Sequence, residues 1–302
     1  MTSQPLRIVI TGARGKIGAR VARLAHEAGH SVIATDTGRP IYDSPTESGP
    51  RYIQADLTRS GDALSIIDGV DVVIHTAAIP EPSKNVPATV FETNTMISWN
   101  VVEAVARGGA ARIVNVSSDS VAGMTWAHSS FVAERCPIDE SLPDRPQDAY
   151  GLSKQVSEQL CDALVRRSAA TAVSVRPTWV LTAQTYATNL APFFRDSSLT
   201  TAVFWSYIDV DDLAELLLLA AEAETTGHEV VYAAAADNIG GRDLAAAVSE
   251  HHPEVVVADL DRVDAAGISS AKAKALFGWT PQRSWRDYLD EDGTPLAPPP
   301  TA

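Results

Sequence analysis

Short apolar runs alternate with longer amphipathic stretches along the first half of the chain. Six runs rich in β-branched residues predict buried strands, because a parallel strand covered on both faces is apolar throughout. The stretches between them have helical periodicity. The predicted strands are 6–10, 31–35, 51–54, 71–76, 112–117 and 171–175, and the predicted helices are one ending at Ala28, then 62–68, 88–107 and 149–167. This alternation, without an internal repeat, predicts an α/β fold with a doubly wound parallel sheet.

Three glycines, Gly12, Gly15 and Gly18, follow the first predicted strand directly and open the first predicted helix. In such a position the first glycine permits a tight turn, the second lets backbone approach a pyrophosphate, and the third lets the helix pack on the strand. The helix N-terminus offers free N–H groups and a partial positive charge to the anion. The loop therefore predicts a dinucleotide site on a Rossmann-type sheet; the alternative is a glycine-rich turn without a ligand.

Asp36 ends the second predicted strand. A carboxylate there can hydrogen-bond the adenosine ribose hydroxyls and repel a 2′-phosphate, which favours NAD over NADP. Arg14 and Arg39 are nearby in the sequence and could instead pair with a 2′-phosphate. An aspartate at a strand end can also simply cap a turn.

The second half of the chain is less regular. Pro177 opens a mixed stretch that runs to Tyr207, where we expect substrate contacts. Beyond it we predict helices at 209–224, 241–250 and 269–277, a strand at 230–233, and a tail at 290–302 with three consecutive prolines. We therefore expect an NAD-binding Rossmann domain with the catalytic residues over 1–176. A mixed α/β substrate-binding region over 177–289, interleaved with it, and a flexible tail complete the predicted organisation.

Tyr150 and Lys154 are four residues apart on a predicted helix, so they lie on one face about a turn apart. The phenol of free tyrosine has a pKa near ~10, too high for easy proton transfer at neutral pH. A nearby ammonium stabilises the phenolate and lowers this pKa, which makes the hydroxyl usable as a general acid or base. Taken alone, the pair could equally be the solvated edge of a helix.

Composition narrows the possible classes. The chain has 302 residues, 45% of them hydrophobic, and a net charge of −14, which argues against nucleic acid or an anionic membrane as the main partner. Two cysteines do not make a disulfide framework, the first residues lack a signal-peptide pattern, and no apolar run is long enough to span a bilayer. Seven scattered histidines show no spacing typical of metal ligands. We expect a soluble cytoplasmic protein without a metal site.

In their order and spacing, these motifs resemble the short-chain dehydrogenase/reductase superfamily, in its extended branch of NAD-dependent epimerases, dehydratases and sugar dehydrogenases. The resemblance runs from Leu6 to about Asp212, where residues 207–212 are similar to the family's short strand leading into a helix. It implies NAD as the cofactor. The implied or predicted cofactor-binding residues are Gly12, Arg14, Gly15, Lys16, Ile17, Gly18, Asp36, Asp56, Leu57, Thr76, Ala77, Ala78, Asn94, Val116, Tyr150, Lys154, Pro177 and Thr178.

The resemblance also implies four catalytic residues, namely Ser118, Tyr150, Lys154 and Asn94. Ser118 is matched by counting back from Gly123, which puts Ser117 one register off. Each position has an ordinary alternative: Ser118 could cap a helix, Asn94 could be a helix-surface residue, and His75 beside the cofactor segment could be a satisfied strand-end histidine.

The implied chemistry is hydride transfer between a carbinol carbon and nicotinamide C4. Tyr150 would take the hydroxyl proton, Ser118 would orient the oxygen, and Lys154 would lower the tyrosine pKa and hold a nicotinamide ribose hydroxyl. Ser118 is followed by Asp119 and then Ser120, which is half of the Asp–Glu pair found in the family's dehydratases. This departure disfavours a dehydratase.

The stretch from Pro177 to Asp209 is short and has Arg195 as its one basic residue, which disfavours a nucleotide diphosphate handle on the substrate. A small sugar, sugar acid or polyol is favoured, as for the branch's uronate and sugar dehydrogenases. The alternative is an NAD-retaining sugar or nucleotide-sugar 4-epimerase, and a remote one is a non-catalytic NAD sensor. The predicted substrate contacts are Ser118, Asp119, Ser120, Trp126, Tyr150, Trp179 and Arg195.

Two of these contacts have equally simple explanations, since Trp126 could be loop packing and Arg195 a solvated surface residue. Extended-branch relatives commonly dimerise through the helices that correspond to 88–107 and 149–167. The resemblance therefore implies a homodimer.

Overall fold

A computed structural model describes residues 4–38, 49–129 and 131–296 of the chain. Seven parallel strands form the central sheet, in the order β10-β7-β5-β4-β1-β2-β3. The strands are β1 (Arg7–Thr11), β2 (Ser31–Asp36), β3 (Arg51–Gln54), β4 (Val72–His75), β5 (Arg112–Val116), β7 (Thr171–Pro177) and β10 (His228–Ala233). All seven coincide with predicted strands, apart from one or two residues at their ends.

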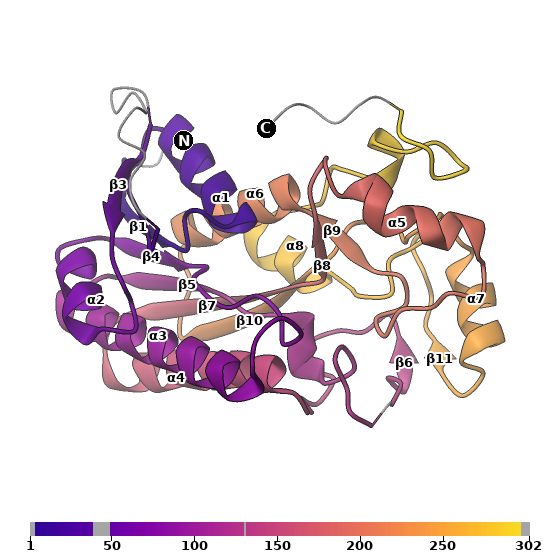
Figure 1. The fold of residues 1–302 in the computed structure, drawn as a ribbon, viewed down its shortest axis with the longest axis horizontal. Coiled ribbons are helices and arrows are strands. Elements are labelled where there is room, and N and C mark those ends of the chain that lie inside the picture. Colours follow the sequence, from indigo (N-terminus) through magenta and orange to yellow (C-terminus); the bar gives the residue numbers. More distant parts are fainter. Residues whose placement is uncertain (1–3, 39–48, 130, 297–302) are drawn as a thin grey trace.

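Helices cover both faces of this sheet, as predicted (Figure 1). On one face α1 (Lys16–Glu27), α6 (Val210–Glu222) and α8 (Ala271–Phe277) bury one apolar cluster. On the other, α2 (Ser60–Ile67), α3 (Pro87–Gly108) and α4 (Ala149–Arg167) bury a second. The doubly wound α/β fold is confirmed.

The order of the strands places a crevice at the centre of the sheet. Strand β1 pairs with β2 on one side and with β4 on the other, and the chain crosses from β3 back to β4. In doubly wound sheets, ligands bind outside the carboxyl ends of the strands at this reversal. The loops after β1 and β4 are therefore the expected site.

A third apolar core lies beyond the carboxyl ends of the sheet and is centred on Tyr186, Trp205 and Tyr207. It draws on both halves of the chain, because Met124 and Ile138 from the segment between β5 and α4 pack in it. This core therefore contains side chains from both of the predicted parts of the chain. Its elements are the 3-10 helices η1 (Asp119–Ala122) and η2 (Trp285–Asp287), helices α5 (Tyr186–Arg195) and α7 (Leu244–His251), and the short strand pairs β6 (Arg135–Cys136) with β11 (Val256–Val257) and β8 (Trp179–Leu181) with β9 (Tyr207–Asp209).

Two predicted helices begin later than expected because an aspartate caps each of them. Asp209 closes β9 and accepts a hydrogen bond from the N–H of Asp211, so α6 starts at Val210. Asp243 accepts from the N–H of Ala246, so α7 starts three residues after Gly241. Both side chains satisfy N–H groups that have no partner within a helix.

The described part of the predicted tail folds back on itself. Leu289 and Pro295 form an antiparallel bridge, and the N–H of Leu296 donates to the carbonyl of Tyr288 at 2.9 Å. Residues 297–302 lie outside the described residues. None of the described helices has the length and apolar character needed to cross a lipid bilayer.

A buried ion pair joins the elements that surround the crevice. Arg176 in β7 is 4% exposed and binds both carboxylate oxygens of Glu158 in α4, at 2.9 and 2.7 Å. It also binds Asp144 at 2.9 Å, and the hydroxyl of Ser117 donates to Glu158 at 2.5 Å. Burial by itself lowers the pKa of Arg176, but the hydrogen bonds and charge of Glu158 outweigh this and keep it raised. One arginine thus connects β5, α4 and β7.

We expect Arg176→Met to lower the free energy of unfolding by about 3–5 kcal/mol, because Glu158 would remain buried without its partner. Urea denaturation measures the change. The matched control is Arg23→Met, which breaks an exposed pair with Glu27 and should change stability little. Equal effects of the two substitutions would contradict a structural role for the buried pair.

Candidate active site

The glycine loop has the tight geometry that a dinucleotide requires. Gly12 has a φ of +67°, and a Cβ atom there would lie 2.7 Å from the backbone of Ala77. A Cβ on Gly18 would overlap the carbonyl oxygen of Gly12. Gly15 precedes α1, and no side chain caps that helix, so its first N–H groups face outward without a side-chain acceptor. The residues therefore fit a pyrophosphate.

Asp36 lies beside this loop. Its carboxylate accepts hydrogen bonds from the N–H of Arg14 at 3.0 Å and of Thr37 at 2.8 Å, so it caps the turn and also holds the loop. Burial raises the pKa of Tyr52 and Arg14 opposes this, while the Tyr52 hydroxyl donates to the carbonyl of Gly38 at 2.9 Å. The other basic residue considered for a 2′-phosphate, Arg39, lies outside the described residues.

The segments predicted to line the cofactor meet the loop from two sides. The hydroxyl of Thr76 donates to the carbonyl of Thr11 at 2.6 Å, which fixes the chain after β4 against the end of β1. Ala77 and Ala78 follow there. The carboxylate of Asp56 accepts from Thr58, and the side chain of Leu57 is buried in the core.

His75 has the ordinary role that the sequence left open. Its Nδ1 lies 2.8 Å from the hydroxyl of Thr11, and its Nε2 lies 3.4 Å from the hydroxyl of Ser98. Burial lowers the pKa of His75 to about 3, with a smaller effect of the Lys154 charge. It is a neutral histidine that joins β4 to β1 and α3.

A cavity of about 610 Å³ opens next to the loop and is lined by six of the seven predicted substrate contacts. Of the predicted substrate contacts, Arg195 is the exception, because it lies exposed at the end of α5 and does not line the cavity. The predicted residues that do line it are Lys16, Ile17, Val116, Ser118, Asp119, Ser120, Trp126, Tyr150, Pro177, Thr178 and Trp179.

Other lining residues were not singled out from the sequence. They are Pro80, Glu81, Lys84, Ser117, Thr125, Val180, Thr201, Ala202, Val203 and Ser206. The first three follow β4, so their position at the carboxyl end of a central strand could have identified them. The group at 201–206 carries no motif and reaches the cavity through a loop in which Phe204 and Trp205 adopt positive φ.

The two neighbouring serines differ in their hydrogen bonds. Ser117 donates to Glu158 in the ion-pair network, whereas the Ser118 hydroxyl bonds Asp119 and Ser120 at the cavity that Tyr150 also lines. Ser118 also caps η1 by accepting from the N–H of Ser120 at 3.1 Å. Ser118 therefore has the helix-capping role that the sequence left open.

Tyr150 and Lys154 are both buried, and their electrostatics differ from the sequence-based expectation. The ammonium of Lys154 donates to the carbonyl of Val116 at 2.7 Å and lies 5.7 Å from the centroid of the Tyr150 ring. Burial raises the pKa of Tyr150, the nearby Ser118 hydroxyl lowers it in part, and the charges of Asp119 and Asp148 raise it. Burial lowers the pKa of Lys154 to about 8.

The expectation that Lys154 lowers the tyrosine pKa is thus wrong for this structure. The reason is that water is excluded from both groups, and desolvation favours the neutral form of each.

Asn94 supports the site without reaching Tyr150. Its side-chain oxygen accepts from the N–H of Ile79 at 2.7 Å, and its amide donates to the carbonyl of Ile79 and to the hydroxyl of Ser153. These bonds hold the loop after β4 against α4. Asn94 is therefore a positioning residue in this geometry.

Two tryptophans form walls of the cavity. Trp126 is 45% exposed and has a φ of +63°, a conformation that side chains other than glycine rarely adopt. Trp179 packs edge-to-face against Phe193, with ring centroids 6.4 Å apart. Strained, exposed aromatic residues beside a cavity are typical of ligand contacts.

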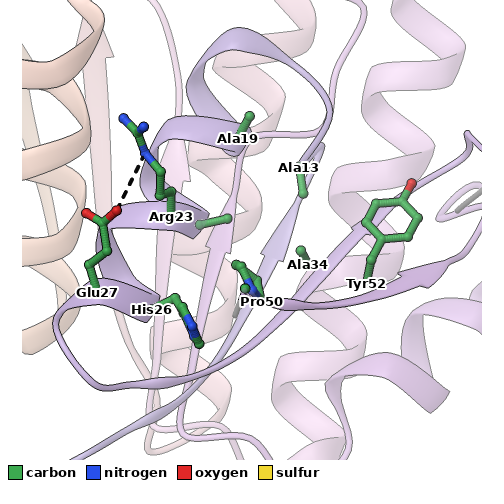
Figure 2. Close-up of a pocket in the computed structure, with 10 residues that line it drawn as sticks. Ala13, Ala19, Arg23, His26, Glu27, Ala34, Pro50 and Tyr52 are labelled. Carbon is green, nitrogen blue, oxygen red and sulfur yellow. Dashed lines mark ion pairs between the residues drawn. The ribbon is translucent and has the colours of Figure 1, made fainter. Parts of the chain in front are cut away.

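Figure 2 shows a second cavity, of about 420 Å³, between α1 and the edge of the sheet. Small side chains such as Ala19 and Ala34 line it, together with Tyr52, and the ion pair between Arg23 and Glu27 lies at its side. It contains none of the predicted catalytic residues. Within the described residues, no three His, Cys, Asp or Glu side chains gather as metal ligands.

Several proteins with similar sequences have names that describe activity on sugars or related alcohols. GDP-mannose 3,5-epimerase 1 of Oryza sativa is 32% identical over 164 residues, which cover 53% of this chain and 42% of the epimerase. L-arabinose 1-dehydrogenase (NAD(P)(+)) of Haloferax volcanii is 32% identical over 183 residues, 59% of this chain and 68% of that enzyme. Uronate dehydrogenase of Pseudomonas putida is 26% identical over 237 residues, 78% of each chain. The chain matches less than half the length of the plant epimerase.

Solved structures share the fold. MoeE5 in complex with UDP-glucose and NAD has a TM-score of 0.69 at 21% identity, covering 93% of this chain and 95% of MoeE5. A mutated uronate dehydrogenase has a TM-score of 0.66 at 22% identity, covering 93% of this chain and 84% of that one. At such identities the likeness establishes the α/β architecture.

The family model described as "NAD dependent epimerase/dehydratase family" matches residues 8–235. The matched range includes the glycine loop, Ser118, Tyr150 and Lys154, and it ends just after β10. Because it covers more than half of the chain and contains every part of the crevice described above, this chain belongs to the NAD-dependent epimerase/dehydratase family.

Proposed function

We propose that the protein is an NAD-dependent oxidoreductase of the extended short-chain type. It transfers hydride between NAD and a secondary alcohol or lactol of a small sugar, sugar acid or polyol. The observation that carries the proposal is that Tyr150 and Ser118 line one cavity together with Lys16 and Ile17 of the glycine loop. This joins a proton-transfer group to a dinucleotide site.

The proposed roles follow from position. When bound, NAD supplies the hydride acceptor, and the protein supplies placement and proton transfer. Gly12, Gly15 and Gly18 would bind the pyrophosphate, and Asp36 the adenosine ribose. Tyr150 would take the proton of the substrate hydroxyl as the carbon loses hydride.

The cavity favours a small substrate without a nucleotide. Both lysines on its wall already have partners: Lys84 pairs with Glu81 at 2.6 Å, and Lys16 donates to the carbonyl of Val180 at 2.7 Å. Arginine is absent from the described lining residues, whereas diphosphates are usually held by arginine or free cations. The names of the arabinose and uronate dehydrogenase relatives agree with this class.

The second candidate is a sugar epimerase that keeps its NAD. It is favoured by the 32% identity to GDP-mannose 3,5-epimerase and by structural neighbours described as UDP-sugar epimerases. Incubation with NAD and a panel of sugars, uronates and cyclitols separates the two. Growth of NADH absorbance in step with product supports the dehydrogenase, and product without NADH supports the epimerase.

Tyr150→Phe should lower turnover by about 10²-fold or more, because the group that takes the proton is lost while the ring is kept. NAD binding, measured by calorimetry, should change less than about threefold. Undiminished turnover in this variant would disprove the assigned role of the phenol.

Gly18→Ala should weaken NAD binding at least about tenfold, because the new methyl group would displace the carbonyl of Gly12. The matched control is Gly61→Ala in α2, where a Cβ would meet nothing within 4 Å. Calorimetric titration of both variants with NAD tests this. Similar affinities would show that the glycine loop does not hold the cofactor.

We further propose a homodimer formed through α3 and α4. Exposed apolar side chains on α3, Phe91, Met96 and Trp99, fall within less than half of the helix circumference, and Leu152 adds to them from α4. Large apolar side chains grouped on one surface are typical of interfaces. A cytoplasmic location is also proposed, because Cys136 and Cys161 are both buried and free.

Light scattering should give about twice the chain mass of 32.1 kDa at micromolar concentration. Trp99→Glu should shift the protein to the monomer, since a charge would be buried in the interface. Leu276→Glu changes an equally exposed apolar residue on α8 and should leave the mass unchanged. A monomeric wild type would refute the dimer.

A further inference from the structure

Arg242 lies behind the cavity that holds Ser118 and Tyr150. It directly precedes the residue that caps α7 and is not among the described residues that line the cavity. Its N–H donates to Oδ1 of Asn238 at 2.8 Å, and the amide of Asn238 donates to the carbonyl of Arg242 at 2.9 Å. Because Asn238 is fully buried, these two bonds fix the backbone from which the arginine side chain extends.

The guanidinium of Arg242 binds the carboxyl end of α5. Its Nη1 donates to the carbonyl of Ser197 at 2.8 Å, and its Nη2 donates to the carbonyl of Phe193 at 2.9 Å. Because both donors belong to one rigid plane, they fix the two carbonyls relative to each other. The ring of Phe193 packs edge-to-face on Trp179, which lines the cavity. Arg242 therefore supports the wall at β8 through α5 (Figure 1).

The same guanidinium supports a second wall of the cavity. Its central carbon lies 5.2 Å from the centroid of the Trp205 ring, which is within the range of a cation–π contact. Trp205 belongs to the segment 201–206, which we call the wall loop. Phe204 and Trp205 are buried in the third apolar core. The other residues of the wall loop with a place on the cavity are Thr201, Ala202, Val203 and Ser206.

The wall loop is held in an unfavourable backbone conformation. Phe204 and Trp205 have φ angles of +50° and +57°, a region that residues other than glycine rarely adopt. Such conformations persist where the surroundings impose them, and they are frequent at ligand sites. The N–H of Trp205 donates to the hydroxyl of Thr201 at 2.6 Å, and its indole N–H donates to the carbonyl of Leu199 at 2.8 Å. On the far side, a Cβ on Gly267 would lie 2.2 Å from that of Phe204.

The contacts of Arg242 differ from those of the other arginines in the same part of the chain. Arg262, Arg283 and Arg286 each pair with an aspartate. Arg242 forms no ion pair with a carboxylate of the described residues, and its guanidinium contacts two carbonyls and a ring instead. Its Nε is buried without a hydrogen-bond partner, which is unfavourable for stability. The arrangement therefore joins two walls without satisfying the arginine fully.

We propose that Arg242 is a positioning residue for substrate selection, an inference that rests on the proposed oxidoreductase function. The side chain contacts neither the substrate nor the cofactor. It holds β8 and the wall loop at a fixed separation and so sets the space between Trp179 and the wall loop. A rigid space discriminates by size, because a smaller substrate loses contacts with the walls and a larger one has to force them apart.

Arg242→Met tests this role, because it keeps most of the apolar stem and removes both carbonyl contacts. We expect KM for the substrate to rise about tenfold and the preference between a pentose and the corresponding hexose to fall. The kcat and the Kd for NAD should change less than about twofold, because the lost contacts act equally on the bound substrate and on the transition state. Unchanged KM, or a joint loss of kcat and NAD affinity, would overturn the proposal.

The matched control is Arg262→Met, which removes an exposed ion pair with Asp264 and should leave KM, kcat and NAD affinity unchanged. Arg242→Lys separates charge from geometry. Lysine keeps a cation, but its ammonium cannot hold two carbonyls and an aromatic ring in one plane. We expect a KM between those of the wild type and Arg242→Met. Full recovery of the wild-type KM would contradict the proposal, since a charge alone would then be sufficient.

A measurement without substrate separates this inference from the proposed function. Hydrogen exchange followed by mass spectrometry should show faster exchange at residues 197–206 in Arg242→Met, whereas β1 and β4 should stay as protected as in the wild type. Unchanged exchange at 197–206, or equal acceleration throughout the chain, refutes the positioning role even where no sugar is oxidised. Local acceleration together with a lack of oxidation counts against the proposed function and leaves the positioning of the walls in place.

Discussion

The geometry of the crevice depends on the buried ion pair between Arg176 and Glu158. The guanidinium is satisfied by carboxylates from α4 and from the segment before it, and it lies directly before Pro177 and Thr178 at the cavity. Such a pair adds little net stability compared with an apolar core, but removing one partner is costly because the other charge stays buried. Its effect is to fix how β5, α4 and β7 meet.

This network separates the roles of the two neighbouring serines, although both line the cavity. Consecutive side chains at the end of a strand point to opposite sides, and the bond from Ser117 to Glu158 assigns one side to the network. The Ser118 hydroxyl instead bonds Asp119 and Ser120 at the cavity that Tyr150 also lines. On α4, Glu158 is one turn beyond Lys154, and its charge opposes the loss of the lysine proton that burial favours. The same contacts that hold the layers together therefore fix where the Ser117 hydroxyl points and oppose the loss of the Lys154 proton.

The sequence was sufficient for the parts of the site that local rules control. Glycine spacing, strand ends and helical spacing were enough to propose Gly12, Ser118, Tyr150 and Lys154, because each depends on its own element, and the structure places Ser118 and Tyr150 on one cavity. The walls at 201–206 and the second-half core were not predictable, since they depend on contacts between segments far apart in the chain. The tyrosine pKa was mispredicted for the same reason: spacing gives the distance to a charge but not the loss of water.

Desolvation favours the neutral form of three titratable side chains at the site. It raises the pKa of Tyr150 and of Asp119 and lowers that of Lys154, so each group is moved toward its neutral form. In bulk water these groups would be charged or neutral according to pH alone, and a neighbouring charge would be screened. Here a charge that enters the cavity with a ligand acts on them at low dielectric, where its effect on proton position is larger. The loss of water, more than any fixed cation of the chain, is therefore the largest influence on the protonation of these three groups.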